Sequence, residues 1–121
     1  MSLIDIILKI NGGKRYSVYS ASVVNDVITG SKIKTYTYLK SVYAVIQQTG
    51  TTKNINGLNL QATQNEGDVK NADLVMYSKV RRNLKERILY KNLYYEIRGI
   101  EDFDNGILKF YKAHLIKVDN Q

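Results

Sequence analysis

The sequence predicts a mainly β protein, a small antiparallel barrel or sandwich of about six to eight strands. Residues that favour strands, among them ten tyrosines, gather in short runs that glycine, asparagine and aspartate separate. Hairpin-type turns rather than crossover helices join the runs, which favours antiparallel pairing. A length of 121 residues, without a repeat or a linker rich in glycine, serine or proline, predicts one domain over residues 1–121.

The beginning of the chain predicts a short apolar element followed by a strand. Residues 3–10 are mostly apolar with one acid, and they fit either one or two turns of helix or a leading strand. An Asn-Gly-Gly step at residues 11–13 ends this element, because adjacent glycines allow positive φ. Residues 14–24 alternate their side chains as a strand does, and an Asn-Asp pair at 25–26 is a turn signal.

The segment richest in β-forming residues covers residues 33–48. It exceeds the roughly 3–10 residues of a typical strand, so we expect a bend or bulge near Lys40 and Ser41. Residues 49–71 then become polar and glycine-bearing, and one turn of helix fits their few apolar side chains. Structureless segments of this length are uncommon inside a compact domain and are usually functional or disordered, so we expect a long loop here.

The C-terminal half predicts further strands joined by tight turns. Residues 73–77 form a short apolar strand, and residues 88–97 form a hairpin that turns at residues 91–92. An Asn-Gly pair at residues 105–106 is the strongest short hairpin signal in the chain, and it leads into a last strand over residues 107–118.

A net charge of +7 makes the chain basic. A basic surface attracts phosphates or acidic protein partners, and the alternative is solubility with local ion pairs. The densest basic stretch, our candidate basic patch, consists of Arg81, Arg82, Lys85 and Arg87. In the alternative interpretation these cations pair locally with Glu86 and Glu96.

No cluster of residues supports catalysis, so we expect neither an enzyme nor a cofactor or metal site. The absence of cysteine excludes a disulfide scaffold, a thiolate zinc site and a cysteine nucleophile. His114 is the single histidine and is expected to be structural, since a zinc site needs several ligands. Glu101, Asp102 and Asp104 could form a calcium or magnesium loop, but turn geometry is the favoured interpretation.

Aromatic residues and lysines alternate in the richest β segment, as they do on barrels that stack single-stranded nucleic acid. The residues concerned are Tyr36, Tyr38 and Tyr43 with Lys34 and Lys40. Core packing with a polar rim explains the same pattern, and we favour it.

The sequence predicts neither a membrane span nor a signal peptide. No apolar run approaches the ~20 residues that cross a bilayer. The N-terminus has no basic region, and Asp5 interrupts its apolar stretch, so we expect the mature chain to begin near Met1. The lack of cysteine fits a reducing compartment.

Three blocks of the sequence are typical of a known family. A strand ends in a polar Gln-Gln-Thr-Gly step over residues 43–50. Leu-Asn-Leu-Gln at 58–61 and Glu-Gly-Asp at 66–68 precede a strand at 74–78. A tyrosine-rich hairpin covers residues 88–97. The matches after this hairpin are residues 100–103, Gly106, Leu108 and Tyr111.

In this order, over about residues 42–118, the chain resembles the small proteins that join head and tail in long-tailed bacteriophages. They are called head-completion, head-closure or stopper proteins. Asn92 stands where the family usually has glycine, a mild departure because asparagine also tolerates the left-handed conformation. Glu86 stands near a position where aspartate is common.

The resemblance implies a β-barrel assembled as a homo-oligomeric ring in the virion neck, between the portal-side adaptor and the tail terminator. The protein would be made in the host cytoplasm, would be monomeric when isolated and would lie near packaged DNA without reading its sequence. The loop at residues 49–71 would reach into the channel or onto neighbouring subunits. Candidate partner or channel residues in this loop are Thr49, Gly50, Lys53, Leu58, Leu60, Gln61 and Asp68.

Two other functions stay open. One is a tail terminator or minor tail protein of similar architecture. The other, which we favour less, is a free nucleic-acid-binding β-barrel, whose affinity for oligonucleotides would fall steeply with salt.

Overall fold

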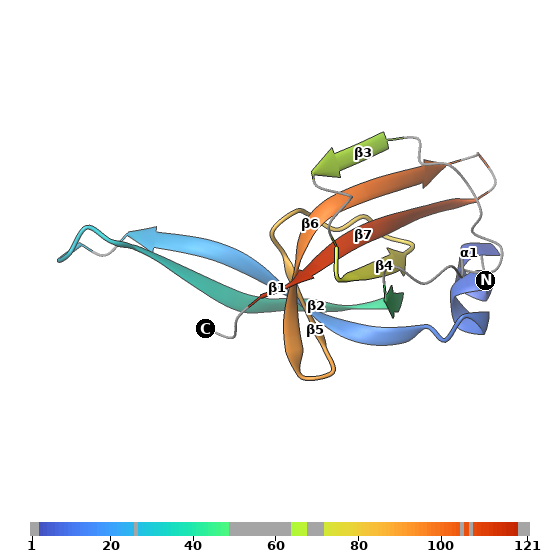
Figure 1. Ribbon diagram of the computed structural model, residues 1–121, viewed down its shortest axis with the longest axis horizontal. Coiled ribbons are helices and arrows are strands. Elements are labelled where there is room, and N and C mark those ends of the chain that lie inside the picture. The colour runs from blue at the N-terminus through green and yellow to red at the C-terminus, as the bar shows by residue number, and fades with distance from the viewer. Residues whose placement is uncertain are drawn as a thin grey trace.

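The computed structural model describes residues 3–25, 27–48, 64–67, 72–104, 106 and 108–118. These residues form one short helix and seven antiparallel strands in a single sheet (Figure 1). The elements are α1 (Leu3–Ile10), β1 (Lys14–Asn25), β2 (Lys32–Gln48), β3 (Gln64–Gly67), β4 (Leu74–Ser78), β5 (Arg87–Tyr90), β6 (Leu93–Asp104) and β7 (Lys109–Lys117). The predicted mainly β antiparallel fold is confirmed, and of the two alternatives at residues 3–10 the structure has the helix.

The sheet curls into a barrel-like ring that is unevenly closed. Its strand order is β3-β6-β5-β1-β2-β4-β7, and β6 also pairs with β7, so six strands complete a circuit and β3 lies on the edge of β6. The β6–β7 ladder has nine residue pairs. The β1–β5 ladder has only two, Val18 with Ile88 and Tyr19 with Arg87, and it is the weakest seam of the ring.

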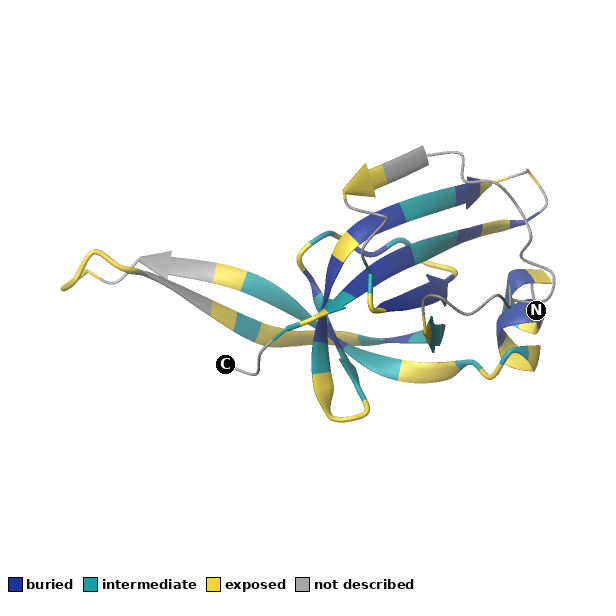
Figure 2. Cartoon of the chain, in the orientation of Figure 1, coloured by how far each residue is buried: buried dark blue, intermediate teal, exposed yellow. Residues whose placement is uncertain are grey.

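Two hydrophobic cores lie on opposite faces of the sheet. Side chains from all six ring strands meet in the interior core, which includes Met76 and Leu115. The second core lies on the other face, where Val75 and Tyr77 pack against buried side chains of α1. Because successive side chains of a strand alternate between faces, all five residues of β4 are buried (Figure 2).

A β-bulge divides the β1–β2 hairpin into two parts. Val18 pairs with Lys40 and Tyr19 pairs with Tyr38, so Leu39 has no partner on β1. The predicted interruption of this long segment is therefore confirmed, next to the expected position at Lys40. Bulges bend a strand and increase its local twist.

Beyond the bulge the hairpin leaves the ring. The last residue of β1 that pairs with β5 is Tyr19, and β2 first pairs with β4 at Ala44. Residues 20–25 and 32–37 therefore pair only with each other and project from the barrel, at the end of the molecule away from α1 (Figure 1). We call these two strand segments, together with turn residues 27–31 and the pair Tyr19 and Tyr38 at their base, the arm.

Part of the expected projecting loop is a strand. Gln64–Gly67 form β3 and pair with β6. A Cβ at Gly67 would meet the carbonyl oxygen of Arg98, because Arg98 is the extra residue of a second bulge, between Ile97 and Gly99. Residues 49–63 and 68–71, with all the candidate loop residues predicted from the sequence, lie outside the described residues.

The predicted tight turn between β5 and β6 is confirmed. Lys91 and Asn92 have φ angles of 50° and 66°, which are the positive values of a type I′ turn. This turn fixes the register in which Leu89 pairs with Tyr94 and Ile88 with Tyr95.

Candidate interaction surfaces

The arm has two chemically distinct faces. The register places Tyr19 opposite Tyr38 and Ala21 opposite Tyr36, so one face is aromatic. The opposite face carries only serine and threonine among the residues whose side chains the structure describes: Ser20, Ser22, Thr35 and Thr37. The hydroxyls of Ser22 and Thr35 hydrogen-bond across the strands at 2.7 Å.

The aromatic face anchors the base of the arm to the β5–β6 hairpin. The ring of Tyr19 meets the rings of Tyr38 and Tyr94 edge-on, with centroids 5.9 and 5.4 Å apart. The guanidinium of Arg87 stacks over Tyr36, 3.5 Å from the ring centre. Such aromatic and cation–π contacts orient the arm without a large core beneath it.

The phenol of Tyr19 stays protonated at neutral pH. Desolvation, followed by the hydrogen bond with Tyr94, raises the pKa of Tyr19 above its ordinary value. Tyr19 therefore adds contact area and a hydroxyl group but no charge to the base of the arm.

The tip of the arm exposes two large apolar side chains. Val27 and Ile28 are 97% and 94% exposed, in a turn that ends at Gly30 with φ of 72°. The backbone N–H of Ser31 donates to Oγ1 of Thr29 at 3.3 Å. An apolar pair held this far from either core contributes little to the fold, and exposed apolar groups of this kind mark contact sites.

The four cations of the candidate basic patch do not share one surface. Arg82 is buried and paired with the buried Glu86, with N–O distances of 3.0 and 2.9 Å. Arg81 forms ion pairs with two other carboxylates, those of Glu66 and Asp102. Of the four, Arg82 is buried, Arg81 and Arg87 are partly exposed, and Lys85 is exposed, so the proposed contact with DNA or an acidic neighbour stays a prediction.

The segment before β5 is fixed by this buried ion pair. The N–H of Lys85 donates to the carbonyl of Ile97, and the N–H of Ile97 donates to the carbonyl of Glu86. Lys85 has a φ of 71°, which a non-glycine residue adopts only in a sharp turn. These contacts explain why a basic stretch that is polar in sequence is partly interior in the structure.

The acidic cluster separates into local contacts. Oε1 of Glu101 lies 2.6 Å from Nε2 of the buried His114, Asp102 faces Arg81, and Asp104 accepts a hydrogen bond from the N–H of Gly106. The residues that the structure describes contain no group of three acidic or histidine side chains placed to hold a metal ion.

The predicted aromatic platform is divided between two places. Tyr36 and Tyr38 belong to the arm, whereas Tyr43 packs against the core beneath α1. The ring of Tyr43 fills the space at Gly13, where an added Cβ would lie 2.5 Å from it. The register keeps all three tyrosines on one face of β2, opposite Ala21, Tyr19 and Arg15. They are divided because the part of β2 that carries Tyr36 and Tyr38 lies outside the ring, which the sequence spacing did not predict.

Comparison with models of known protein families and with curated proteins finds no match. Within the described part of the chain, no helix has the length and apolar character to cross a membrane.

Proposed function

We propose that the protein is a structural component of a phage neck, which joins the portal-side adaptor of the DNA-filled head to the tail and helps to close the DNA channel. The observation that carries this proposal is the arm, because its tip exposes Val27 and Ile28 almost completely. The sequence resemblance over about residues 42–118 supplies the neck as the place of action.

The arm is a two-stranded ribbon that projects from the barrel. Two-stranded ribbons are marginal on their own, and this one has aromatic contacts only at its base. Burying a valine or isoleucine gains about 1.5–3 kcal/mol, which the isolated protein does not realise at the tip. An arm that fits a different patch on a neighbouring subunit or ring makes a heterologous contact, the kind from which closed rings are built.

A tail-side role uses the same arm. A tail terminator or minor tail protein also assembles through projecting contacts, so the arm alone supports either. The stage at which assembly stops separates them: loss of a neck protein leaves finished tails, whereas loss of a terminator leaves tails of irregular length.

One observation favours the nucleic-acid alternative. Tyr19, Tyr36 and Tyr38 line one face of the arm beside Arg87, and aromatic strands with cations stack unpaired bases. The nucleic-acid hypothesis predicts micromolar binding of single-stranded DNA that weakens steeply with salt and is lost in the Tyr38→Ala variant. The neck proposal predicts no such binding by the isolated chain.

Electron microscopy of particles assembled without this protein tests the neck proposal. DNA-filled heads that leak and carry no tail, beside complete free tails, are the expected result. Restoring the protein by complementation should restore tailed particles. Normal infectious particles in its absence would contradict the proposal.

A further inference from the structure

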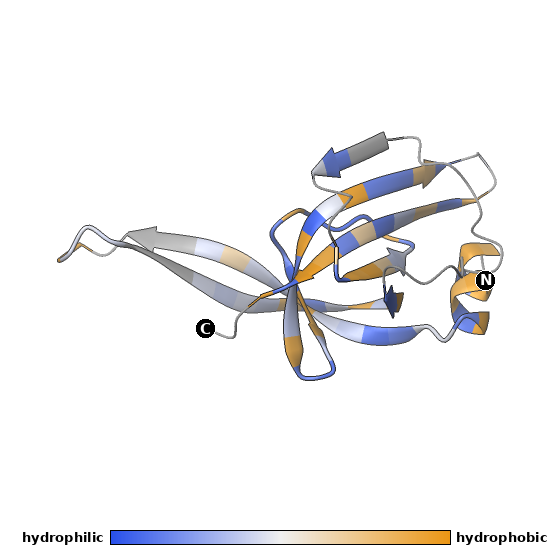
Figure 3. Ribbon diagram, in the orientation of Figure 1, coloured by the Kyte–Doolittle hydropathy of each residue, from blue (hydrophilic) through white to orange (hydrophobic). Residues whose placement is uncertain are grey.

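The helix α1 keeps an uncovered apolar side after its inner side has joined the core. Leu3, Ile6 and Ile10 are 48%, 45% and 70% exposed. At 100° per residue they lie within about 60° of one another on the helix. Figure 3 shows apolar colour around much of α1, where a surface helix usually carries a polar outer face.

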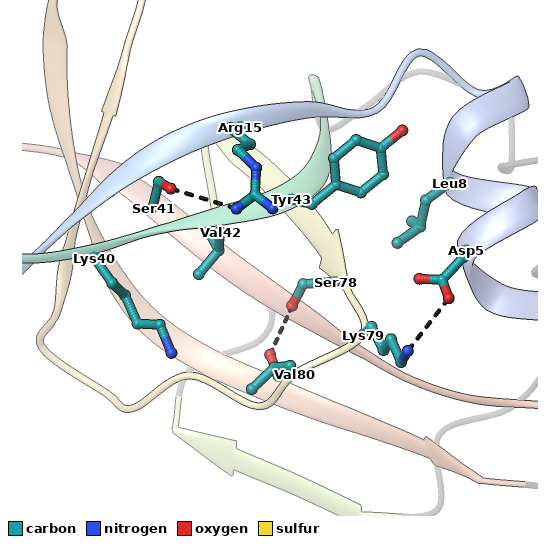
Figure 4. Close-up of a pocket in the computed structure, with 10 residues that line it drawn as sticks. All are labelled: Asp5, Leu8, Arg15, Lys40, Ser41, Val42, Tyr43, Ser78, Lys79 and Val80. Carbon is teal, nitrogen blue, oxygen red and sulfur yellow. Dashed lines mark hydrogen bonds and ion pairs between the residues drawn. The ribbon is translucent and has the colours of Figure 1, made fainter. Parts of the chain in front are cut away.

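Two adjoining hollows open beside α1 at the end of β4, and we call them together the α1 cleft. The first, of about 280 Å³, lies between α1 and β2 (Figure 4), and the second, of about 410 Å³, lies beside Leu3 and Ile4. Both are lined by Lys79 and Val80. The apolar lining of the cleft consists of Leu3, Ile4, Leu8, Val42 and Val80.

Val80 occupies the centre of this cleft in a fixed position. The buried hydroxyl of Ser78 donates to the carbonyl of Val80 at 2.9 Å, which holds the chain where it leaves β4. Nζ of Lys79 lies 3.2 Å from the carboxylate of Asp5, which ties the same segment to α1. The side chain of Val80 stays 55% exposed between the two hollows.

The described residues of the cleft carry more positive than negative charge. Among the described residues that line it, the basic ones are Arg15, Lys40, Lys79, Arg81 and Lys109, and the one acid is Asp5. Asp5 forms an ion pair with Lys79, and Arg81 forms ion pairs with Glu66 and Asp102. Among the described residues, no carboxylate forms an ion pair with Lys40 or Lys109, and Arg15 has only a long hydrogen bond, 3.4 Å, to Ser41.

We propose that the α1 cleft binds an acidic segment of a partner protein, with an apolar side chain on Val80 and carboxylates toward Lys40 and Lys109. Charge complementarity selects an acidic partner, and the apolar centre selects a peptide over nucleic acid, whose backbone offers phosphates but no apolar side chain. This proposal depends only on the residues of the cleft and is independent of the proposed function in a phage neck.

Selection from random displayed dodecapeptides, followed by fluorescence anisotropy with the best peptide, tests the proposal on the intact chain. Enriched sequences should combine Asp or Glu with Leu, Ile, Val or Phe. Chemical-shift changes on binding should centre on the amides of Lys79, Val80 and Lys109. A labelled oligothymidine measured in parallel should bind at least tenfold more weakly than the peptide.

Three variants separate the cleft from general electrostatics. Val80→Ser and the pair Lys40→Glu with Lys109→Glu should each weaken the peptide about tenfold or more. Lys117→Glu changes an exposed lysine of the same strand, β7, and should leave the affinity within twofold. Melting curves establish that all variants fold.

Three results would overturn the proposal. They are enriched peptides without acidic residues, equal losses from Lys117→Glu and the cleft variants, and tighter binding of the oligothymidine with no effect of Val80→Ser. The last result would indicate a phosphate site. None of these measurements depends on neck assembly, so their failure is distinguishable from failure of the proposed function.

Discussion

Arg82 and Glu86 form a two-pronged ion pair inside the protein, with each side chain less than a tenth exposed. Glu86 also accepts the N–H of Asn83 at 3.2 Å. A buried ion pair of this kind adds little net stability compared with apolar residues of equal size, but removal of one partner leaves a buried charge without compensation. The pair therefore specifies how the segment before β5 folds onto β6.

The substitution Glu86→Gln should lower the free energy of unfolding by about 3 kcal/mol, because Arg82 keeps its charge and loses its partner. Urea unfolding measures this change. The double variant Arg82→Met with Glu86→Leu should restore most of the loss. A cost below about 1 kcal/mol for the single change would show that the pair is dispensable.

Tyr77 gives the protein a stability limit at alkaline pH. Burial, and next the nearby carboxylate of Glu101, raises the pKa of Tyr77 above its ordinary 10.0. The unfolded chain therefore releases this proton first, so the stabilising effect of the neutral phenol is complete below pH 10 and is lost as pH rises through the folded pKa.

Unfolding free energy should therefore be steady below pH 10 and fall above it. Urea titrations at increasing pH measure the slope, which Tyr77→Phe should reduce. Equal slopes for the wild type and Tyr77→Phe would assign the alkaline transition to other groups.

The sequence predicted less at the residue scale than at the scale of elements. Close spacing made Arg81, Arg82, Lys85 and Arg87 a candidate basic patch, yet Arg82 is buried against Glu86, Arg81 pairs with Asp102 and Arg87 stacks on Tyr36. Spacing along the chain does not record which way a side chain turns when the segment lacks regular structure.

The β5–β6 hairpin is the element that local sequence determined best. Its turn residues Lys91 and Asn92 both have positive φ, as the two-residue spacing between tyrosine-rich runs predicted. Replacing Asn92 with glycine should raise the unfolding free energy by about 0.5 kcal/mol, because glycine adopts this φ without steric cost. Asn92→Ala should lower it, and thermal melts of both variants give the comparison.

A lower free energy of unfolding for Asn92→Gly would contradict the claim that the positive φ at residue 92 limits the stability of the turn. The control is Gly106→Ala, at a turn glycine with φ of 88° and open space around it, where alanine should be destabilising.

The arm depends on contacts from outside its own strands. Tyr94 holds Tyr19 at the base, 5.4 Å between ring centres. Tyr94→Ala should therefore increase hydrogen–deuterium exchange at the amides of residues 20–22 and 35–37, with little change at β4. Leu93→Ala alters the neighbouring, partly exposed residue and serves as the control. Unchanged exchange in the arm would mean that its strands are stable by themselves.

The projection of the arm from the ring was not predicted from the sequence. Residues 14–24 and 33–48 were correctly predicted as strands, with an interruption near Lys40. The alternation of side chains in these strands does not show that residues 20–25 and 32–37 lack further neighbours. That depends on the lengths of β4 and β5, which the local sequence of the hairpin does not contain. The available signal was Val27-Ile28, an apolar pair between two turn signals where turn residues are normally polar.

At the scale of the whole molecule, the ring places two exposed apolar features at opposite ends. The arm tip lies at one end and α1 with its cleft lies at the other (Figure 1). The arm tip belongs to neither core, whereas the inner side of α1 is part of the second core. Alternation of apolar residues along β4 and β7 could not predict the second core, since it exists only because α1 covers the outer face.

This arrangement predicts that assembly can be lost without loss of the fold. The paired substitution Val27→Asp with Ile28→Asp changes only the arm tip, which packs against neither core, so the melting temperature should stay within about 2 °C of wild type. Leu93→Asp makes the same kind of change at a partly exposed residue of the β5–β6 hairpin.

Complementation of particles that lack this protein, scored by electron microscopy for tailed and tailless DNA-filled heads, tests the role of the arm most directly. If the arm tip makes the assembly contact, Val27→Asp with Ile28→Asp leaves heads without tails, whereas Leu93→Asp and the wild-type chain restore tailed particles. Tailed particles in normal numbers from the arm-tip variant would contradict this role of the arm.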